Sequence, residues 1–213
     1  MDELREFLQS LSYPLYYLDF ETFSLPIPPY DNLSPYSKVP FQYSLHVQDE
    51  PGGRLRHCSY LAEPGADPRP EFLRHVLEDT EGEGDIVVYH KPFEHSVLSS
   101  LTAAHPQAEN AINDRLDRMV DLLDPFRKQL YWHPKMGGSN SIKNVLPVFA
   151  PELSYQELEV ENGEQAMAAF VRLSAERDPA RITEQRQALL DYCELDSLAM
   201  ARILDGLRRI VGL

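Results

Sequence analysis

The segment Leu15–Glu21 (LYYLDFE) constrains the fold more than any other part of the chain. Its apolar and aromatic side chains are typical of a buried β-strand, yet it carries two acids. Because strand side chains alternate between faces, Asp19 and Glu21 project to one face, and Leu18 and Phe20 to the other. Neighbouring carboxylates repel each other, and a divalent cation such as Mg²⁺ or Mn²⁺ relieves that repulsion. The alternative interpretation is an exposed acidic edge strand.

The rest of the chain predicts a mixed sheet covered by helices. Helices are expected over residues 2–10, 70–79, 92–104, 108–118, 163–177 and 179–207, and strands over 41–47, 55–61 and 85–89, with a further apolar stretch at 119–123. The proline-rich stretch 25–40 is expected to be a loop. Strands come first and then alternate with helices, so we predict one α/β domain over residues 1–213.

Composition and charge limit the possible functions. No apolar run approaches the roughly 20 residues that span a bilayer, and the first residues are charged, so we expect a cytoplasmic protein without a membrane partner. Cys58 and Cys193 lie far apart and no histidines have ligand spacing, so we expect carboxylates, not a zinc site, to hold any metal. A net charge of −14 disfavours tight binding of long duplexes, unless metal ions supply positive charge or the substrate is short.

Two further segments carry acids that would complete a metal site. In Asp191–Asp196 (DYCELD), Tyr192 and Asp196 are four residues apart and share a helix face. The tyrosine would orient a metal-bound water while Asp196 binds the ion, or it packs on the core beside a solvated aspartate. Glu94 is expected in the first turn of a helix after a buried strand, where the helix dipole also explains an acid.

Taken together, the three motifs resemble those of the DEDD exonuclease superfamily, the DnaQ-like proofreading and RNA-trimming nucleases. The late motif is similar to that of the tyrosine subclass, since the histidine subclass has histidine where this chain has Asp191. The chain departs from the family pattern twice. The family usually has aspartate at the position of Glu94 and asparagine at that of His90.

The resemblance implies a ribonuclease H-like fold with a mixed β-sheet flanked by α-helices, and two Mg²⁺ or Mn²⁺ ions. It implies four metal-binding carboxylates, Asp19, Glu21, Glu94 and Asp196, and Tyr192 as the catalytic group that orients water. Because glutamate is one methylene longer than aspartate, Glu94 would keep the metal spacing only if its backbone sits further back.

A second resemblance covers nearly the whole chain. The segments 17–22, 40–46, 141–147 and 190–196 are similar to a bacterial family catalogued as domain of unknown function 2779. That domain is often the C-terminal part of longer proteins. The chain is therefore expected to be either an excised part of a longer multidomain protein or a stand-alone version.

Residues outside these motifs have weaker signals for substrate binding. Asp121 resembles an aspartate that follows the second motif in many DnaQ-like enzymes, where it would support the site or simply end a strand. Ser139, Ser141 and Lys143 lie in a loop before a short helix, which suits a phosphate but is also explained by helix capping. Tyr36 would stack on bases, unless its proline-rich loop is only a stiff connector.

Three functional hypotheses follow. The first is a metal-dependent 3′-to-5′ exonuclease on single-stranded DNA or RNA or short oligonucleotides, with the 3′ polarity implied by the resemblance alone. The second is a nucleic-acid-binding or regulatory module that has lost catalysis. The third is a phosphodiesterase on nucleotides or dinucleotides, which suits the acidic surface. Protein partners are not predicted by the sequence.

Overall fold

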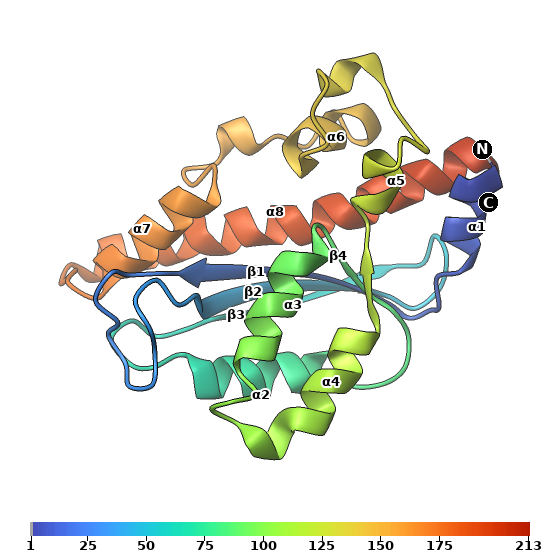
Figure 1. Ribbon diagram of the computed structural model, residues 1–213. Coiled ribbons are helices and arrows are strands. Elements are labelled where there is room, and N and C mark those ends of the chain that lie inside the picture. The colour runs from blue at the N-terminus through green and yellow to red at the C-terminus, as the bar shows by residue number, and fades with distance from the viewer. Residues whose placement is uncertain (1) are drawn as a thin grey trace.

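The computed structural model describes residues 2–213 and centres on a five-stranded mixed sheet (Figure 1). The strands are β1 (Leu15–Phe23), β2 (Val39–Gln48), β3 (Leu55–Leu61), β4 (Ile86–Val88) and β5 (Met119–Asp121). They are arranged in the order β3-β2-β1-β4-β5. The pairs β1–β2 and β2–β3 are antiparallel, whereas β4 and β5 run parallel to β1. The predicted α/β architecture with a mixed sheet is confirmed.

Helices cover both faces of the sheet (Figure 1). They are α1 (Asp2–Gln9), α2 (Arg69–Asp79), α3 (Lys91–Ser100), α4 (Glu109–Asp117), α5 (Asp124–Arg127), α6 (Ile142–Phe149), α7 (Gly163–Leu173) and α8 (Pro179–Val211), with 3₁₀ turns at 106–108, 134–136 and 155–157. One face carries α6, α7 and the long α8, and the other carries α2, α3 and α4. None of the helices in the described range combines the length and the apolar character that crossing a membrane requires.

The structure corrects the predicted boundaries in a few places. Strand β2 begins at Val39 and so includes Pro40, whereas the proline-rich sequence predicts a loop up to this residue. Pro40 pairs with Thr22 next to a register shift in β1. A local irregularity of this kind tolerates a residue that has no N–H to donate. Helix α7 ends at Leu173 rather than at 177, and α8 continues to Val211 rather than ending at 207.

The two faces of β1 are as different as the alternation predicted. Leu18 and Phe20 face the α2–α4 side, where they pack in a buried core with Phe72 of α2 and Val97 of α3. The opposite face, beneath α8, combines apolar packing with buried polar groups. The consequence is that Asp19 and Glu21 lie under a helix rather than in solvent.

Strand β2 presents a row of polar side chains to α8. The row consists of Gln42, Ser44, His46 and Gln48, all of them buried. Gln42 Nε2 donates to the Leu189 carbonyl at 2.7 Å, and the hydroxyls of Ser44 and Ser197 lie 2.7 Å apart. Helix α8 is therefore attached to the sheet by hydrogen bonds as well as by apolar contact.

Candidate metal centre

Three carboxylates from the two ends of the chain meet between β1 and α8. One oxygen each of Asp19, Glu21 and Asp196 lies within 4.8 Å of the others. Glu21 and Asp196 are only 7% and 6% exposed, and Asp19 is partly exposed. The thiol of the buried residue Cys193 lies 3.7 Å from Asp19 Oδ2. The structure thus brings these three acids together, as the sequence predicts.

Burial and mutual repulsion perturb the acids of this group. Burial, followed by the charges of Asp196, Glu21 and Glu94, raises the pKa of Asp19 well above its ordinary range. Burial and the charge of Asp196 raise the pKa of Glu21 to about 8. Burial also raises the pKa of Asp196, to about 6. Acids that are hard to ionise together are the arrangement that a bound cation relieves.

Glu94 lies beside the three acids without joining their compact group. It is 2% exposed on the first turn of α3, and burial followed by the charge of Asp121 raises its pKa to about 8. Its Oε2 has no hydrogen-bond partner among residues 2–213. Its charge nevertheless raises the pKa values of Asp19 and Glu21, so the Glu94 carboxylate lies near enough to these acids to repel them.

Asp121 holds the start of the helix that carries Glu94. Its Oδ1 accepts hydrogen bonds from the backbone N–H groups of His90 and Leu123, both at 3.0 Å. His90 is the N-cap residue of α3 and adopts a left-handed backbone with φ +84°. Non-glycine residues rarely adopt this conformation, so an acceptor that fixes it stabilises the turn. Asp121 therefore ends β5 and fixes the start of α3, while its role as a supporting acid of the site stays a prediction.

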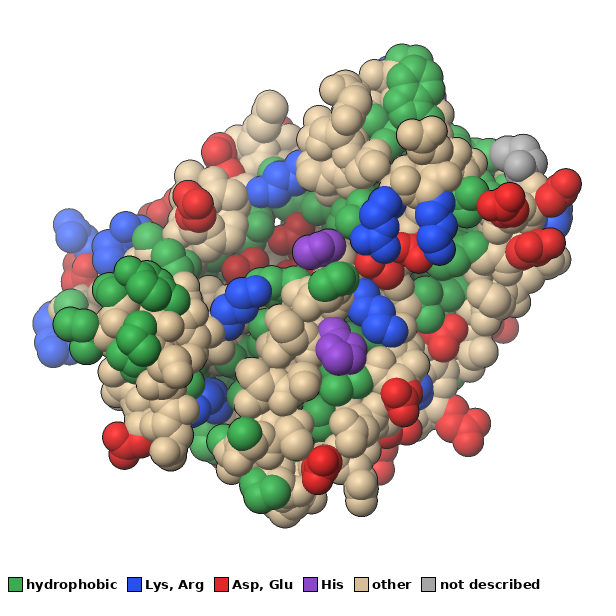
Figure 2. Space-filling model, in the orientation of Figure 1, with side chains coloured by type: hydrophobic (Ala, Val, Ile, Leu, Met, Phe, Trp, Pro, Cys, Tyr) green, Lys and Arg blue, Asp and Glu red, His purple; other side chains and the backbone are tan. Residues whose placement is uncertain are grey.

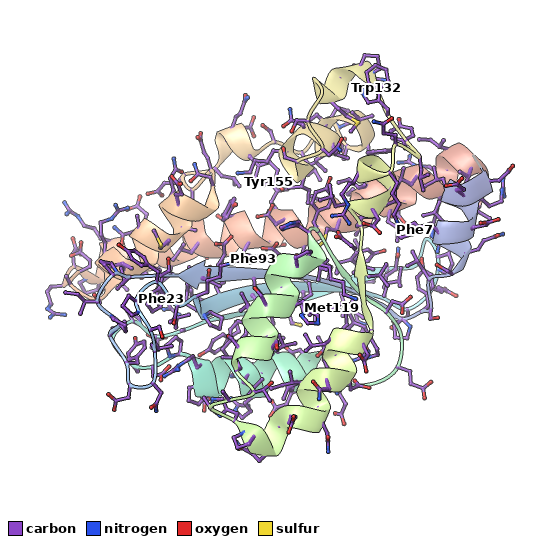
Figure 3. The ribbon with its side chains drawn as sticks, in the orientation of Figure 1. Phe7, Phe23, Phe93, Met119, Trp132 and Tyr155 are labelled. Atoms are coloured by element: carbon purple, nitrogen blue, oxygen red, sulfur yellow. The ribbon has the colours of Figure 1, made fainter. Side chains whose placement is uncertain are left out.

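Two tyrosines cover Asp196 on the side opposite the sheet. The Tyr155 hydroxyl donates to Asp196 Oδ1 at 2.6 Å, and Figure 3 shows Tyr155 between α6 and α8. Tyr192, one turn before Asp196, is buried with its ring edge-on to that of Tyr155 at 6.2 Å. Burial and the charge of Asp196 raise the pKa values of both phenols, so they stay protonated at neutral pH. Sequence analysis missed Tyr155 because it belongs to a 3₁₀ turn outside every motif.

Cationic side chains stand at the edge of the acidic group. Lys143 Nζ lies 5.1 Å and 5.3 Å from the ring centroids of Tyr155 and Tyr192, and its charge lowers the pKa values of Glu21 and Asp196. Lys38 Nζ lies 4.3 Å from the centre of the Phe93 ring, and its positive charge counteracts the rise in the pKa of Glu94. Figure 2 shows acidic atoms inside a hollow with Lys and Arg side chains at its rim. The hollow therefore has acidic side chains at its base and basic side chains around its opening.

The other three residues predicted to bind substrate have less direct relations to the acids. Ser139 Oγ accepts from the Ser141 N–H at 3.2 Å, and the Ser141 hydroxyl donates to Asn144 Oδ1 at 2.7 Å. Ser141 is the N-cap residue of α6, but its side chain makes no capping hydrogen bond. Tyr36 is 68% exposed in the 25–38 loop, with a left-handed backbone. Their roles in substrate binding stay predictions.

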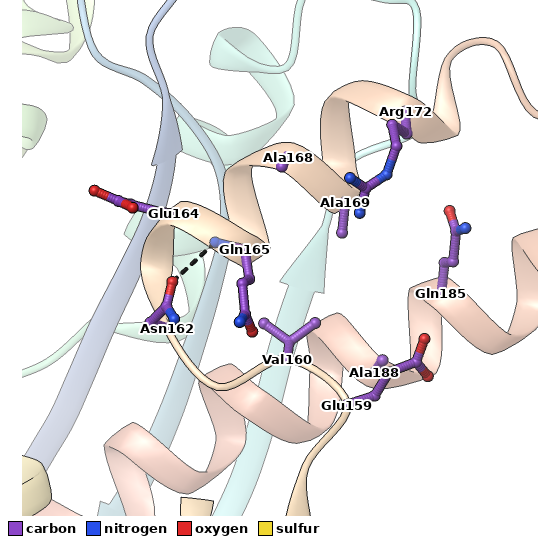
Figure 4. A pocket seen from close by; sticks show the side chains of 10 residues that line it. All are labelled: Glu159, Val160, Asn162, Glu164, Gln165, Ala168, Ala169, Arg172, Gln185 and Ala188. Carbon is purple, nitrogen blue, oxygen red and sulfur yellow. Dashed lines mark hydrogen bonds between the residues drawn. The ribbon is translucent and has the colours of Figure 1, made fainter. Parts of the chain in front are cut away.

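A cavity of about 420 Å³ lies between α7, the start of α8 and the segment 159–162 (Figure 4). Arg172 and Gln185 line it, and Gln185 Oε1 is buried without a partner among the described residues. Asn162 Oδ1 accepts from the Gln165 N–H at 3.0 Å at its rim. A Cβ placed on the next residue, Gly163, would lie 3.6 Å from Glu21 Oε2. Of the carboxylates, Glu21 is thus close to a residue that lies between two lining residues of the cavity, Asn162 and Glu164.

Comparison with known proteins gives a family and two relatives. Residues 16–141 match the family described as "Domain of unknown function (DUF2779)", a range that includes Asp19, Glu21 and Glu94 but not the motif on α8. The Uncharacterized protein UU173 of Ureaplasma parvum is 28% identical over 167 residues, which cover 69% of the chain and 24% of that protein. The Uncharacterized protein MG366 homolog of Mycoplasma pneumoniae is 26% identical over 216 residues, which cover 92% of the chain and 32% of that protein. The chain spans about a quarter to a third of the length of these relatives. No solved structure matches it.

Proposed function

The chain belongs to the DUF2779 family, and we propose that its carboxylate centre is the active site of a metal-dependent phosphodiester hydrolase of the DEDD type. The observation that carries the proposal is the convergence of Asp19, Glu21 and Asp196, from β1 and α8, on one buried point. The strand order β3-β2-β1-β4-β5, with β2 antiparallel to both of its neighbours and β4 and β5 parallel to β1, supports a ribonuclease H-like fold for the domain.

The donor set fits hard divalent cations. Every ligand candidate is a carboxylate oxygen, which Mg²⁺ and Mn²⁺ prefer over nitrogen or sulfur. The unpartnered Oε2 of Glu94 and the raised pKa values of Glu21 and Asp196 indicate that the protein alone stabilises the ionised forms of these carboxylates poorly. Bound Mg²⁺ or Mn²⁺ ions, two in sites of this type, would supply Lewis-acid activation of water and stabilisation of the leaving oxygen.

The residues of the chain would bind the ions and orient the attacking water. Asp19, Glu21 and Asp196 would hold the ions, with Glu94 at the edge of the set. Tyr155 donates to Oδ1 of Asp196, and hydrogen bonding from both Tyr155 and Tyr192 counteracts the rise in the pKa of Asp196 that burial causes. The hydroxyl of Tyr192 stays protonated because its pKa is raised, so it can donate to or orient an attacking water.

The surroundings favour a short, flexible, anionic substrate. With a net charge of −14 the protein as a whole repels polyphosphates, so binding has to rely on local cations. Lys143 and Lys38 supply such cations beside the acids, and a scissile phosphate between them would be attracted from both sides. We infer that single-stranded DNA or RNA ends or short oligonucleotides are hydrolysed in the 3′-to-5′ direction, the polarity following from the family resemblance.

The test is cleavage of end-labelled single-stranded oligonucleotides by the purified chain with Mg²⁺ or Mn²⁺. Asp19→Asn and Asp196→Asn should reduce the rate at least about a hundredfold, since a lost metal ligand removes several kcal/mol of transition-state stabilisation. Asp191→Asn is the matched control, because Asp191 is exposed on the same helix and its carboxylate accepts a hydrogen bond from Gln187 on that helix. Equal rates for Asp19→Asn and the wild type would refute the proposal.

One observation favours a second candidate function. Glu94 stands outside the compact group of three acids, and a centre with three close ligands suits a nucleic-acid-binding or regulatory module that has lost catalysis. Calorimetric titration with Mn²⁺ distinguishes the two, since an inactive module of this kind would bind the ion weakly or not at all. Activity confined to dinucleotides in a length series would instead favour the phosphodiesterase hypothesis.

A further inference from the structure

A second group of metal-ligating side chains lies on the same face of the sheet as the carboxylates. It consists of His46 on β2, His57 on β3 and Glu194 on α8, and one ligand atom of each lies within 4.8 Å of the others. His46 and His57 are direct partners in the β2–β3 ladder, and their rings are stacked with centroids 4.5 Å apart. The two histidines are eleven positions apart in the sequence, which is not a ligand-type spacing. This pair of histidines contrasts with the expectation from the sequence that only carboxylates hold a metal.

A serine hydroxyl holds one nitrogen of each imidazole. Ser197 Oγ lies 2.8 Å from His46 Nδ1, and Ser44 Oγ lies 2.9 Å from His57 Nε2. The two hydroxyls are themselves 2.7 Å apart. Metal-binding histidines usually have their second nitrogen fixed by such a partner, because this sets the tautomer and the direction of the ligating nitrogen. In His57 the other nitrogen, Nδ1, faces Glu194 Oε1 at 3.8 Å.

The burial of the three side chains leaves a way in for an ion. His46 is buried, whereas the side chains of His57 and Glu194 are 28% and 47% exposed. Donor atoms around a tetrahedral ion with bonds of about 2.0–2.1 Å are roughly 3.3 Å apart. The side chain of Glu194, which is about half-exposed, can close the remaining distance by rotation while Ser44 and Ser197 keep the two imidazole rings in place.

We propose that His46, His57 and Glu194 bind one transition-metal ion, with Zn²⁺ the best match to two imidazoles and one carboxylate, and solvent as the fourth ligand. Imidazole nitrogen favours Zn²⁺ over Mg²⁺, so this site differs in selectivity from the all-oxygen centre. The ion would join the β2–β3 hairpin to α8 two residues before Asp196. It would therefore restrain the helix segment that carries a ligand of the first centre, whether or not that centre is catalytic.

The proposal is tested by calorimetric titration of the 213-residue chain with Zn²⁺ in excess Mg²⁺, which occupies all-oxygen sites. We expect one Zn²⁺ per chain in the wild type, and at least about a tenfold loss of affinity in both His57→Ala and Glu194→Gln. His75→Ala on α2 and Glu184→Gln on the exposed side of α8 are the matched controls and should bind as the wild type does.

A second measurement separates this proposal from the first centre and from misfolding. Mn²⁺ affinity and the thermal melting curve without metal should be nearly the same for Glu194→Gln and the wild type, while Glu21→Gln should lose Mn²⁺ and keep Zn²⁺ binding. Zn²⁺ binding that survives both His57→Ala and Glu194→Gln, or a wild type that binds no Zn²⁺ at micromolar concentration, would overturn the proposal.

Discussion

Replacement of Glu94 by glutamine should make the metal-free protein more stable at neutral pH. Burial and the charge of Asp121 raise the pKa of Glu94 from its ordinary 4.5 to about 8 in the folded state. A carboxyl group whose pKa is raised on folding contributes stability that is fully present below pH 4.5. This stability is lost as the pH rises through about 8, because the unfolded chain ionises freely and the folded one does not. Glutamine has the shape of the protonated acid and does not titrate.

The size of the difference in the free energy of unfolding at pH 7 follows from the part of the pKa shift that lies below pH 7. Between pH 4.5 and pH 7 the difference spans roughly 2.5 pKa units, which correspond to about 3 kcal/mol at 1.36 kcal/mol per unit. For a chain of this length, that difference moves the melting temperature by about 6–12 °C. We therefore expect Glu94→Gln to melt higher than the wild type in a chelator at pH 7, and the two to melt together near pH 4.

Urea unfolding in EDTA at several pH values measures the difference directly, with Glu83→Gln, an exposed loop position, as the control. Addition of Mn²⁺ should reverse the order of stability. The ion stabilises the wild type by binding to it, whereas the variant lacks the Glu94 carboxylate and should bind the ion more weakly. A Glu94→Gln variant that is no more stable than the wild type at pH 7 would contradict the prediction, and so would an advantage that persists unchanged at pH 4, where no charge has to be buried.

Three further substitutions test the surroundings of the site. Tyr155→Phe removes the donor at 2.6 Å from Asp196, which should lower the hydrolysis rate about tenfold and move the acidic limb of the pH–rate profile upward, since that hydrogen bond lowers the pKa of Asp196; an unchanged profile would contradict this. Asp121→Ala should cost about 2–3 kcal/mol in chemical denaturation, because two backbone N–H groups lose their acceptor; a neutral effect would show that water replaces it. Gly206→Ala should destabilise by about 1–3 kcal/mol, because its Cβ would lie 2.2 Å from Phe149 Cδ1, and adding Phe149→Leu should restore part of the loss.

The sequence predicted most of the secondary structure and the core of the site because both depend on local periodicity. Alternation along β1 is enough to place Asp19 and Glu21 on one face and Phe20 on the other, whatever packs against them. Helical spacing likewise fixes Tyr192 and Asp196 on one side of α8. That the acids of β1 lie close to Asp196 of α8 does not follow from local periodicity. This part of the prediction depended on the family resemblance.

The residues that sequence analysis missed are those whose role depends on non-local contacts. Tyr155 reaches Asp196 from a 3₁₀ turn, and nothing in its own neighbourhood indicates an acid nearby. His46 and His57 become neighbours only through the register of β2 and β3. The polar residues of β2 alternate with apolar ones, a pattern typical of a strand with one face in water, yet α8 covers that face.

The hydrogen bonds between β2 and α8 have a consequence for the carboxylates. A helix resting on a purely apolar surface can slide along its axis or roll about it at little cost. Gln42 and Ser44 attach α8 at Leu189 and Ser197, eight residues or about 12 Å apart along the helix, and two separated points of attachment stop both movements. Asp196 is next to one of these points. The gap across which the acids face each other is consequently set by the folded protein before any ion arrives, so an ion of the wrong size would have to strain the sheet to bind.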